Sequence, residues 1–205
     1  MKKEMIAACL VLVCSLVGTS AMAADANSTE SIKDRFGITG EIGFLVPADS
    51  DAVGTGFVIG RGHTDTGFVG GGGLIYGILN NYAAEFEVTH TGFGTDAGTD
   101  FDTTNISLGA QYRYLNLPVK KLVPYAGFGL DILVNGANNG LDVDTVAGVH
   151  VKAGADYFLL RQLALTSEIK GVIAPNADIK AGGAKVGEFD PDSFSMTFGV
   201  RYFFN

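Results

Sequence analysis

Apolar and polar residues alternate with a period of two through the last thirteen residues of the chain, 193–205. One face of this segment carries only apolar side chains, which are Phe194, Met196, Phe198, Val200, Tyr202 and Phe204. The period indicates a β-strand that lies between two unlike environments. An edge strand this apolar would template aggregation in water. We therefore predict the closing strand of a barrel, with its apolar face toward lipid.

The same alternation recurs seven more times upstream. The first strand ends at Pro47, and the later ones are predicted over residues 66–79, 82–91, 101–114, 123–134, 143–158 and 162–173. Short turns at 80–81, 115–122 and 159–161 alternate with long loops at 48–65, 92–100, 135–142 and 174–192. This rhythm predicts an all-β fold, an eight-stranded antiparallel up-and-down transmembrane β-barrel with short periplasmic turns and four longer extracellular loops.

Prolines and tyrosines are placed as this fold requires. All five prolines fall in loops, in turns or at a strand start, because a hydrogen-bonded ladder needs every backbone donor. All seven tyrosines fall near the short-turn ends of strands, where an aromatic girdle at a membrane interface is expected. The tyrosines are Tyr76, Tyr82, Tyr112, Tyr114, Tyr125, Tyr157 and Tyr202.

A secreted soluble barrel with its apolar face inside would show the same alternation. The glycines of the polar face argue against it, since small residues are needed where an eight-stranded wall curves tightly around a narrow lumen. These glycines are Gly43, Gly71, Gly73, Gly77, Gly109, Gly127, Gly129, Gly148, Gly154 and Gly199. We therefore predict that the polar face lines the lumen.

The first 23 residues have the features of a secretory signal peptide. Lys2 and Lys3 precede an apolar run over 5–17, and Ala21-Met22-Ala23 is a small-x-small cleavage motif. Both cysteines fall inside this segment, so the mature chain has no thiol chemistry. Residues 24–36 are polar and unpatterned and are predicted as a periplasmic N-terminal segment, followed by the barrel domain over 37–205.

Three short stretches carry a family resemblance. Residues 124–129 (PYAGFG), 154–158 (GADYF) and the ending 199–204 (GVRYFF) resemble the OmpW-type small outer-membrane β-barrels, within the wider group of OmpA/OmpW-type eight-stranded barrels. The resemblance covers roughly Phe36 to the end, although this chain has no tryptophan and Asn205 follows the last aromatic residue. It implies the outer membrane of a Gram-negative bacterium. It also implies passage of small hydrophobic solutes, which enter from outside and leave sideways or through the base.

The inward residues divide by height along the barrel. The apolar mouth is predicted at Leu45, Val69, Leu133 and Val172. The polar and constricting residues are predicted to be Glu41, Glu85, Glu87, Arg113, Asp131, His150, Lys152, Glu168, Lys170 and Arg201. An apolar mouth above a polar floor resembles the OmpW-type design, which implies a passive route for hydrophobic molecules. If these aliphatic residues only seal the barrel against its loops, no transport is expected.

Pairing the strands at 143–158 and 162–173 about Leu160 sets Lys152 opposite Glu168 and His150 opposite Lys170. Buried charges persist only when they are paired. Such pairs either form a constriction that solutes bypass or plug the lumen, which would make the protein a structural or adhesive barrel of the OmpA type. A lipid-modifying enzyme with His150, Asp131 or Glu168, and Ser195 lacks a supporting motif, so no enzyme is expected.

Composition limits the partners. The formal net charge of −8 argues against nucleic acid. The expected partners are outer-membrane lipid and lipopolysaccharide, the barrel-assembly machinery through the C-terminal strand, and small hydrophobic solutes. We expect no cofactor and no metal. Each long loop contains or borders an Asp-x-Asp pair, interpreted as solvated acidic residues in preference to a Ca²⁺ or Mg²⁺ site; the pairs begin at Asp49, Asp100, Asp142 and Asp190.

Overall fold

The computed structural model describes residues 31–48, 50–54, 57–62, 66–94, 100–137 and 140–204. The predicted signal peptide, residues 1–23, lies outside these ranges. Within them, no helix is long and apolar enough to cross a membrane.

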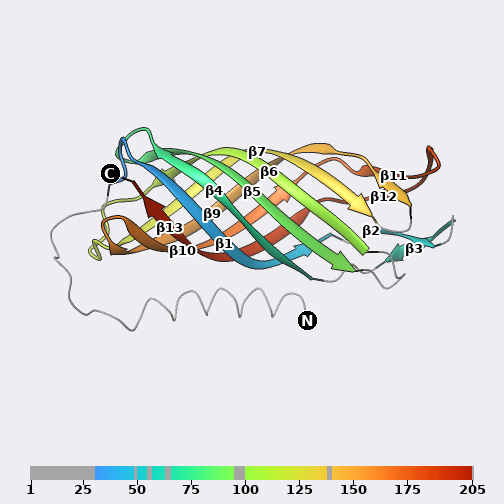
Figure 1. Cartoon of the computed structure of the whole chain (residues 1–205), viewed down its shortest axis with the longest axis horizontal. Helices are drawn as coiled ribbons and strands as arrows, with labels where there is room; N and C mark the ends of the chain where they lie inside the picture. Colours follow the sequence, from blue (N-terminus) through green and yellow to red (C-terminus); the bar gives the residue numbers. More distant parts are fainter. Residues whose placement is uncertain are drawn as a thin grey trace.

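Eight strands of the described chain close into one barrel (Figure 1). They are β1 (Phe36–Pro47), β4 (Gly67–Gly77), β5 (Tyr82–Gly94), β6 (Asp100–Arg113), β7 (Leu122–Ala137), β9 (Val146–Leu160), β10 (Leu163–Ile173) and β13 (Ser193–Phe203). The order around the barrel is β1-β13-β10-β9-β7-β6-β5-β4, and every neighbouring pair is antiparallel. The predicted fold class is confirmed.

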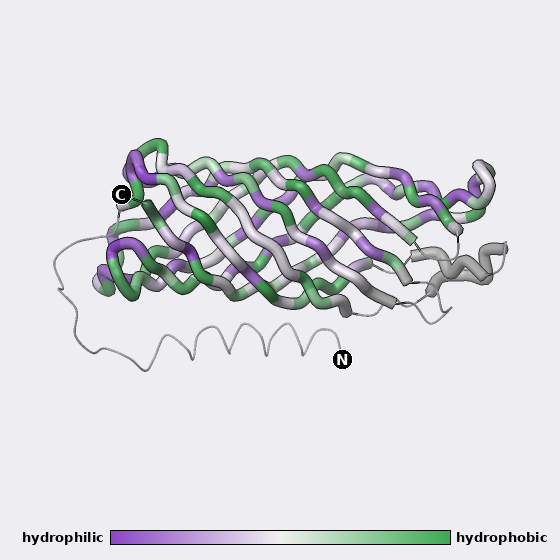
Figure 2. Tube along the Cα trace, viewed as in Figure 1, coloured by the Kyte–Doolittle hydropathy of each residue, from purple (hydrophilic) through white to green (hydrophobic). Residues whose placement is uncertain are grey.

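The apolar face points outward along every barrel strand. Phe44, Phe128, Leu130 and Val151 are all more than 60% exposed, while the charged inward residues are buried. Figure 2 shows the resulting alternation of hydrophobic and hydrophilic residues along the strands. An outer wall of this composition is suited to hydrocarbon and not to water.

Three of the long loops that were predicted without strands contain them. The first loop holds a hairpin, β2 (Ser50–Gly54) and β3 (Phe57–Gly62). The third and fourth loops together form a three-stranded sheet in the order β12-β11-β8, from β12 (Ala184–Phe189), β11 (Ala177–Ala181) and β8 (Leu141–Val143). These elements lie at the end of the barrel opposite the C-terminus (Figure 1), which we call the long-loop end.

A glycine pair explains the hairpin that sequence reading missed. Gly182 and Gly183 have φ angles of 57° and 85°, the left-handed values that a two-residue hairpin turn requires. The sheet packs through its own apolar cluster of Phe101, Val143, Ala177, Ile179 and Phe189. Phe101 on β6 stacks on Phe189 with ring centroids 5.3 Å apart, which ties the sheet to the barrel rim.

The opposite end, which carries the short turns, is closed by a hydrophobic seal. Seven residues that are at most 1% exposed form it: Ile32, Ile75, Ala83, Val123, Phe158, Ala164 and Phe203. Ile32 comes from the predicted N-terminal segment, so residues 31–35 dock against the barrel before Phe36 begins β1.

Backbone hydrogen bonds to Gly77 hold this docked segment. Asp34 N donates to Gly77 O at 2.7 Å, and Gly77 N donates to Arg35 O at 3.0 Å. The Arg35 guanidinium also donates to Arg161 O at 2.8 Å. A Cβ at position 77 would lie 1.9 Å from Ile32 O, so only glycine allows this close approach.

Gly77→Ala is expected to release residues 31–35 while the barrel stays closed, because the clash is with the backbone of the docked segment. Hydrogen exchange of the protein in lipid nanodiscs measures this as a loss of protection around Ile32. Gly171→Ala is the matched control, since a Cβ at position 171 has nothing within 4 Å. Unchanged protection of Ile32 in Gly77→Ala would contradict the docking geometry.

Candidate functional site

A recess opens into the barrel at the long-loop end. It holds about 590 Å³ of empty space, counting its open mouth. The four residues predicted for the apolar mouth all line it: Leu45, Val69, Leu133 and Val172. Phe189 and Pro191, from the fourth loop, add further apolar surface to the rim.

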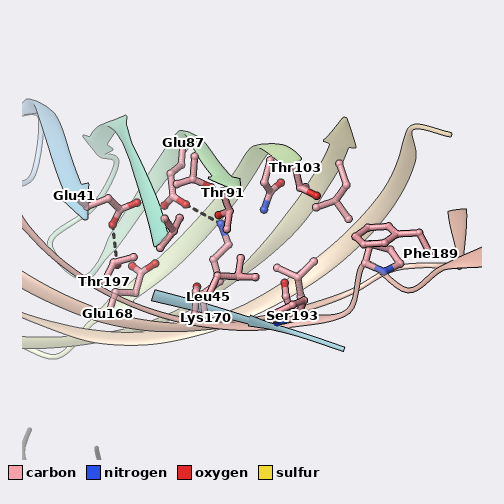
Figure 3. A pocket seen from close by; sticks show the side chains of 18 residues that line it. Glu41, Leu45, Glu87, Thr91, Thr103, Glu168, Lys170, Phe189, Ser193 and Thr197 are labelled. Atoms are coloured by element: carbon pink, nitrogen blue, oxygen red, sulfur yellow. Dashed lines mark hydrogen bonds and ion pairs between the residues drawn. The ribbon is translucent and has the colours of Figure 1, made fainter. Parts of the chain in front are cut away.

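The wall becomes more polar with depth. Six hydroxyl side chains also line the recess: Thr89, Thr91, Thr103, Ser193, Ser195 and Thr197. Thr91, Ser193 and Ser195 pair directly with Val69, Val172 and Leu45, so they lie at the height of the rim. At the end away from Phe189 lie Glu41, Glu87 and Glu168, with Lys170 extending toward them (Figure 3). The recess is thus a cup whose upper part carries apolar and hydroxyl side chains and whose floor is charged.

Two lysines hold the carboxylates of the floor together. Lys152 forms ion pairs with Glu85, with Glu168 at 3.1 Å and with Glu87 at 3.5 Å. Lys170 donates to Glu87 at 2.7 Å. All five side chains are buried, so their charges are compensated inside the barrel and not by water.

A second layer lies toward the short-turn end. Asp156 is fully buried between two guanidinium groups, Arg113 at 2.7 Å and Arg201 at 3.1 Å. Arg201 also reaches Glu85 at 2.9 Å, which joins this layer to Lys152. Tyr125 links the two layers, because its hydroxyl donates to Glu168 at 2.9 Å and both guanidinium groups lie over its ring.

The pairing of β9 with β10 differs from the prediction by two residues. Lys152 lies opposite Lys170, and His150 lies opposite Val172. The strands extend to Leu160, the turn follows at Arg161, and a bulge between Leu163 and Ala164 shifts the register. The predicted faces survive because a shift of two residues returns each side chain to the same side of the sheet. Lys152 still reaches Glu168 diagonally.

His150 faces an acid, contrary to the prediction that it would face Lys170. Its Nδ1 is 2.7 Å from Asp131 Oδ2. Asp131 Oδ1 accepts hydrogen bonds from Ser107 at 2.6 Å and from Asn105 at 2.9 Å. The His150–Asp131 pair is therefore part of a hydrogen-bonded network on the lumen wall. The hydroxyl group in contact with this pair is that of Ser107, whereas Ser195, on β13, lies opposite Lys170.

Tyr125 departs from the predicted girdle. Its side chain is 4% exposed and points into the lumen, as the alternation within its strand requires. Five other tyrosines lie exposed on the outer wall or in the turns beside it: Tyr76, Tyr82, Tyr112, Tyr114 and Tyr202. Sequence position alone placed Tyr125 at the correct height, but the face that it occupies makes it a lumen residue.

Three members of the acidic loop pairs, Asp144, Asp190 and Asp192, accept hydrogen bonds within the protein, and Asp49 lies outside the described residues. Asp144 accepts from Lys180 at 2.6 Å, and this hydrogen bond raises the pKa of Lys180. Asp192 accepts from the backbone of Ala174 at 2.8 Å. On the same sheet, hydrogen bonds from Lys185 and then Asn176 lower the pKa of Glu188. The contacts of Lys180 and Lys185 involve strands of the loop sheet, whereas the contact of Asp192 joins the two ends of the fourth loop.

The three glutamates of the floor are the one described group of side chains spaced to share a metal ion. One carboxylate oxygen from each of Glu41, Glu87 and Glu168 lies within 4.8 Å of the others. Lys152 and Lys170 already stand against two of them, which lowers the attraction of the group for a bare divalent ion.

Comparisons with known proteins agree with the geometry. Residues 9–204 match the model of the outer membrane protein β-barrel domain. OprG from Pseudomonas aeruginosa has a similar fold, with a TM-score of 0.70 at 16% identity over 87% of this chain and 100% of that one. AlkL, solved in DMPC lipid bilayers, has a TM-score of 0.59 at 18% identity over 92% of this chain and 97% of that one.

A third structure, Neisserial surface protein A, has a TM-score of 0.61 at 18% identity over 82% of this chain and 97% of that one. No curated protein sequence matches the chain. At these identities the structures show a shared fold. The expected resemblance to small eight-stranded outer-membrane barrels is confirmed.

Proposed function

Because the chain belongs to the outer membrane protein β-barrel domain family and lies in the outer membrane of a Gram-negative bacterium, we propose that it gives small hydrophobic molecules a passive route through that membrane. The solutes enter the recess from outside and leave sideways into the bilayer. The observation that carries this proposal is the recess itself, which carries apolar side chains at its rim and has a closed floor.

The floor argues against flow along the barrel axis. Beneath the recess, Lys152, Arg201 and their carboxylate partners fill the lumen with buried ion pairs. Separating a buried pair leaves an uncompensated charge, which costs about 3–5 kcal/mol. Below the pairs, the hydrophobic seal around Ile32 closes the short-turn end. An ion or a sugar would have to displace both closures.

The barrel wall favours a lateral exit over β4. The last pair between β4 and β5 joins Phe68 to Gly92, whereas β5 continues to Gly94 and pairs there only with β6. Residues 70–73 of β4 are all glycine, so the wall carries no bulky side chains here, although it stays closed by continuous pairing with β1 and β5. Among the described residues, the wall therefore extends less far at β4 than at β5, beside Val69, one of the apolar residues of the rim.

A structural or adhesive barrel of the OmpA type is the second candidate. The two closures of the lumen favour it, and so does the ordered sheet of β8, β11 and β12 at the long-loop end, which offers a surface to other molecules. The two candidates differ in solute flux, because a structural barrel would carry none.

Flux measurements in proteoliposomes test the proposal. We expect faster uptake of a small apolar dye than in protein-free liposomes, no swelling in sugars, and an ion conductance equal to that of the lipid alone. Val69→Asn should slow the uptake several-fold, because an unpaired amide at the rim disfavours apolar solutes. Val119→Asn, in the short turn and exposed, is the matched control. Uptake equal to that of protein-free liposomes would instead support the structural barrel.

A further inference from the structure

One carboxylate in the floor of the recess lacks a cationic partner. Glu41 is 7% exposed and accepts a hydrogen bond from Thr197 at 2.9 Å. In the part of the chain that the structure describes, no ion pair involves Glu41. A buried carboxyl group in this position needs either a proton or a cationic donor.

The charges around Glu41 do not supply that donor. Glu41, Glu87 and Glu168 lie within reach of one another, and Lys152 and Lys170 are the two ammonium groups against them. Glu85, which Lys152 shares with Arg201, and Asp131 also lie against these lysines, so the two ammonium groups are outnumbered by carboxylates and Glu41 has no cation of its own. Lys170 is also engaged by Ser107 at 2.8 Å and lies 3.8 Å from Asp131, which draws it away from Glu41.

A second acceptor on the same recess is unpartnered. Asn105 is 8% exposed and lines the recess, and its Nδ2 donates to Asp131. Its other amide atom, Oδ1, has no hydrogen-bond partner. A buried acceptor without a partner costs about 1–3 kcal/mol, so a hydrogen-bond donor that enters the recess gains by meeting it.

We propose that the recess selects solutes with a hydrogen-bond-donating cationic head, namely small primary alkylammonium ions. This inference rests on the proposed function and names the solute class. The head donates to Glu41 at the floor, Asn105 Oδ1 offers a second acceptor on the wall of the same recess, and the tail lies along the rim beside Leu45, Val69 and Leu133. Both free groups are acceptors, so they match an ammonium group and reject a carboxylate.

A bare metal ion fits the recess less well. Lys152 lies 3.1 Å from Glu168 and 3.5 Å from Glu87, so its charge opposes a divalent ion bound to those carboxylates. A metal ion would also leave the apolar rim without a partner. An alkylammonium ion meets the uncompensated charge of Glu41 and buries its tail against the rim, at about 0.8 kcal/mol per CH₂ group in transfer free energy.

Binding of a matched ligand series tests the proposal in lipid nanodiscs. Pentylammonium, pentanol and pentanoate share one tail and differ only in the head. Against empty nanodiscs, we expect pentylammonium to bind the wild-type protein about tenfold more tightly than pentanol, since a charge-assisted hydrogen bond is worth this factor. Pentanoate should bind most weakly of the three.

The variant Glu41→Gln keeps the shape and the contact with Thr197 but removes the charge, so pentylammonium should then bind no better than pentanol. Glu188→Gln, on the loop sheet, removes the same charge outside the recess and should keep the preference. Equal binding of pentylammonium and pentanol to the wild type overturns the inference and leaves the proposed function standing. Competition by Mg²⁺ at matched ionic strength would assign the floor to a metal ion and also overturn it. Absence of binding by all three ligands, together with absent dye uptake, would reject the proposed function itself.

Discussion

Asp156→Ala is expected to lower the free energy of unfolding by about 3–5 kcal/mol, the usual cost of removing one partner from a buried ion pair. Asp156 is fully buried and is held by Arg113 at 2.7 Å and by Arg201 at 3.1 Å. Its removal leaves Arg113 without its carboxylate, because the second carboxylate of this layer, Glu85, contacts Arg201. Two buried atoms of Arg113, Nε and Nη1, already lack hydrogen-bond partners, so Arg113 has few other contacts to compensate for the loss of Asp156.

Urea titration of the protein refolded into lipid vesicles measures this loss. Asp156→Asn should cost less than Asp156→Ala, because the amide oxygen still accepts from a guanidinium group while the charge is lost. Asp178→Ala is the control, since Asp178 forms a surface ion pair with Lys185 at 2.7 Å and such pairs contribute little. If Asp156→Ala destabilises the protein no more than Asp178→Ala, the network does not hold the lumen closed.

Gly43→Ala is expected to destabilise the barrel by about 3 kcal/mol, the upper end of the usual cost of overpacking. Gly43 lies on β1 opposite Thr197 of β13, at the seam where the first and last strands close the barrel. A Cβ there would lie 2.0 Å from Met196 O and 2.7 Å from Thr197 Cα. Both are backbone atoms, so the two strands would have to separate.

Gly40→Ala, three residues earlier on β1, provides the comparison because a Cβ at position 40 has nothing within 4 Å. This substitution should be neutral or slightly stabilising, since glycine within a strand costs about 0.5–1 kcal/mol relative to alanine. The folded fraction after refolding and the urea midpoint measure both effects. Equal behaviour of the two variants would show that the seam tolerates a side chain.

Much of the lumen could be predicted without coordinates. The alternation of Leu45, Val69 and their counterparts decided which face each residue occupies, and strand direction decided its height. Contacts across the lumen were harder, because they depend on strand tilt and stagger around the closed barrel. The ion pair between Lys170 and Glu87 joins residues 83 positions apart on strands that are not neighbours in the barrel. No pattern of residue pairs in the sequence predicts this ion pair.

The elements that sequence reading missed share a cause. The strands β8, β11 and β12 are three to six residues long, too short for a period of two to stand out. The docking of Ile32 involves a single apolar residue in a polar segment. In both cases the favourable energy comes from tertiary packing and not from local propensity.

The sequence by itself determined the barrel, its closing strand and the division between an apolar outer face and a polar inner face, because a period of two is a property of each strand alone. The tertiary structure decided the register of β9 against β10, the partners of His150 and the uncompensated charge of Glu41. These features depend on how strands that are distant in the chain are positioned relative to one another around the closed barrel. A bulge near Leu163, invisible in the alternation, is enough to exchange one set of partners for another.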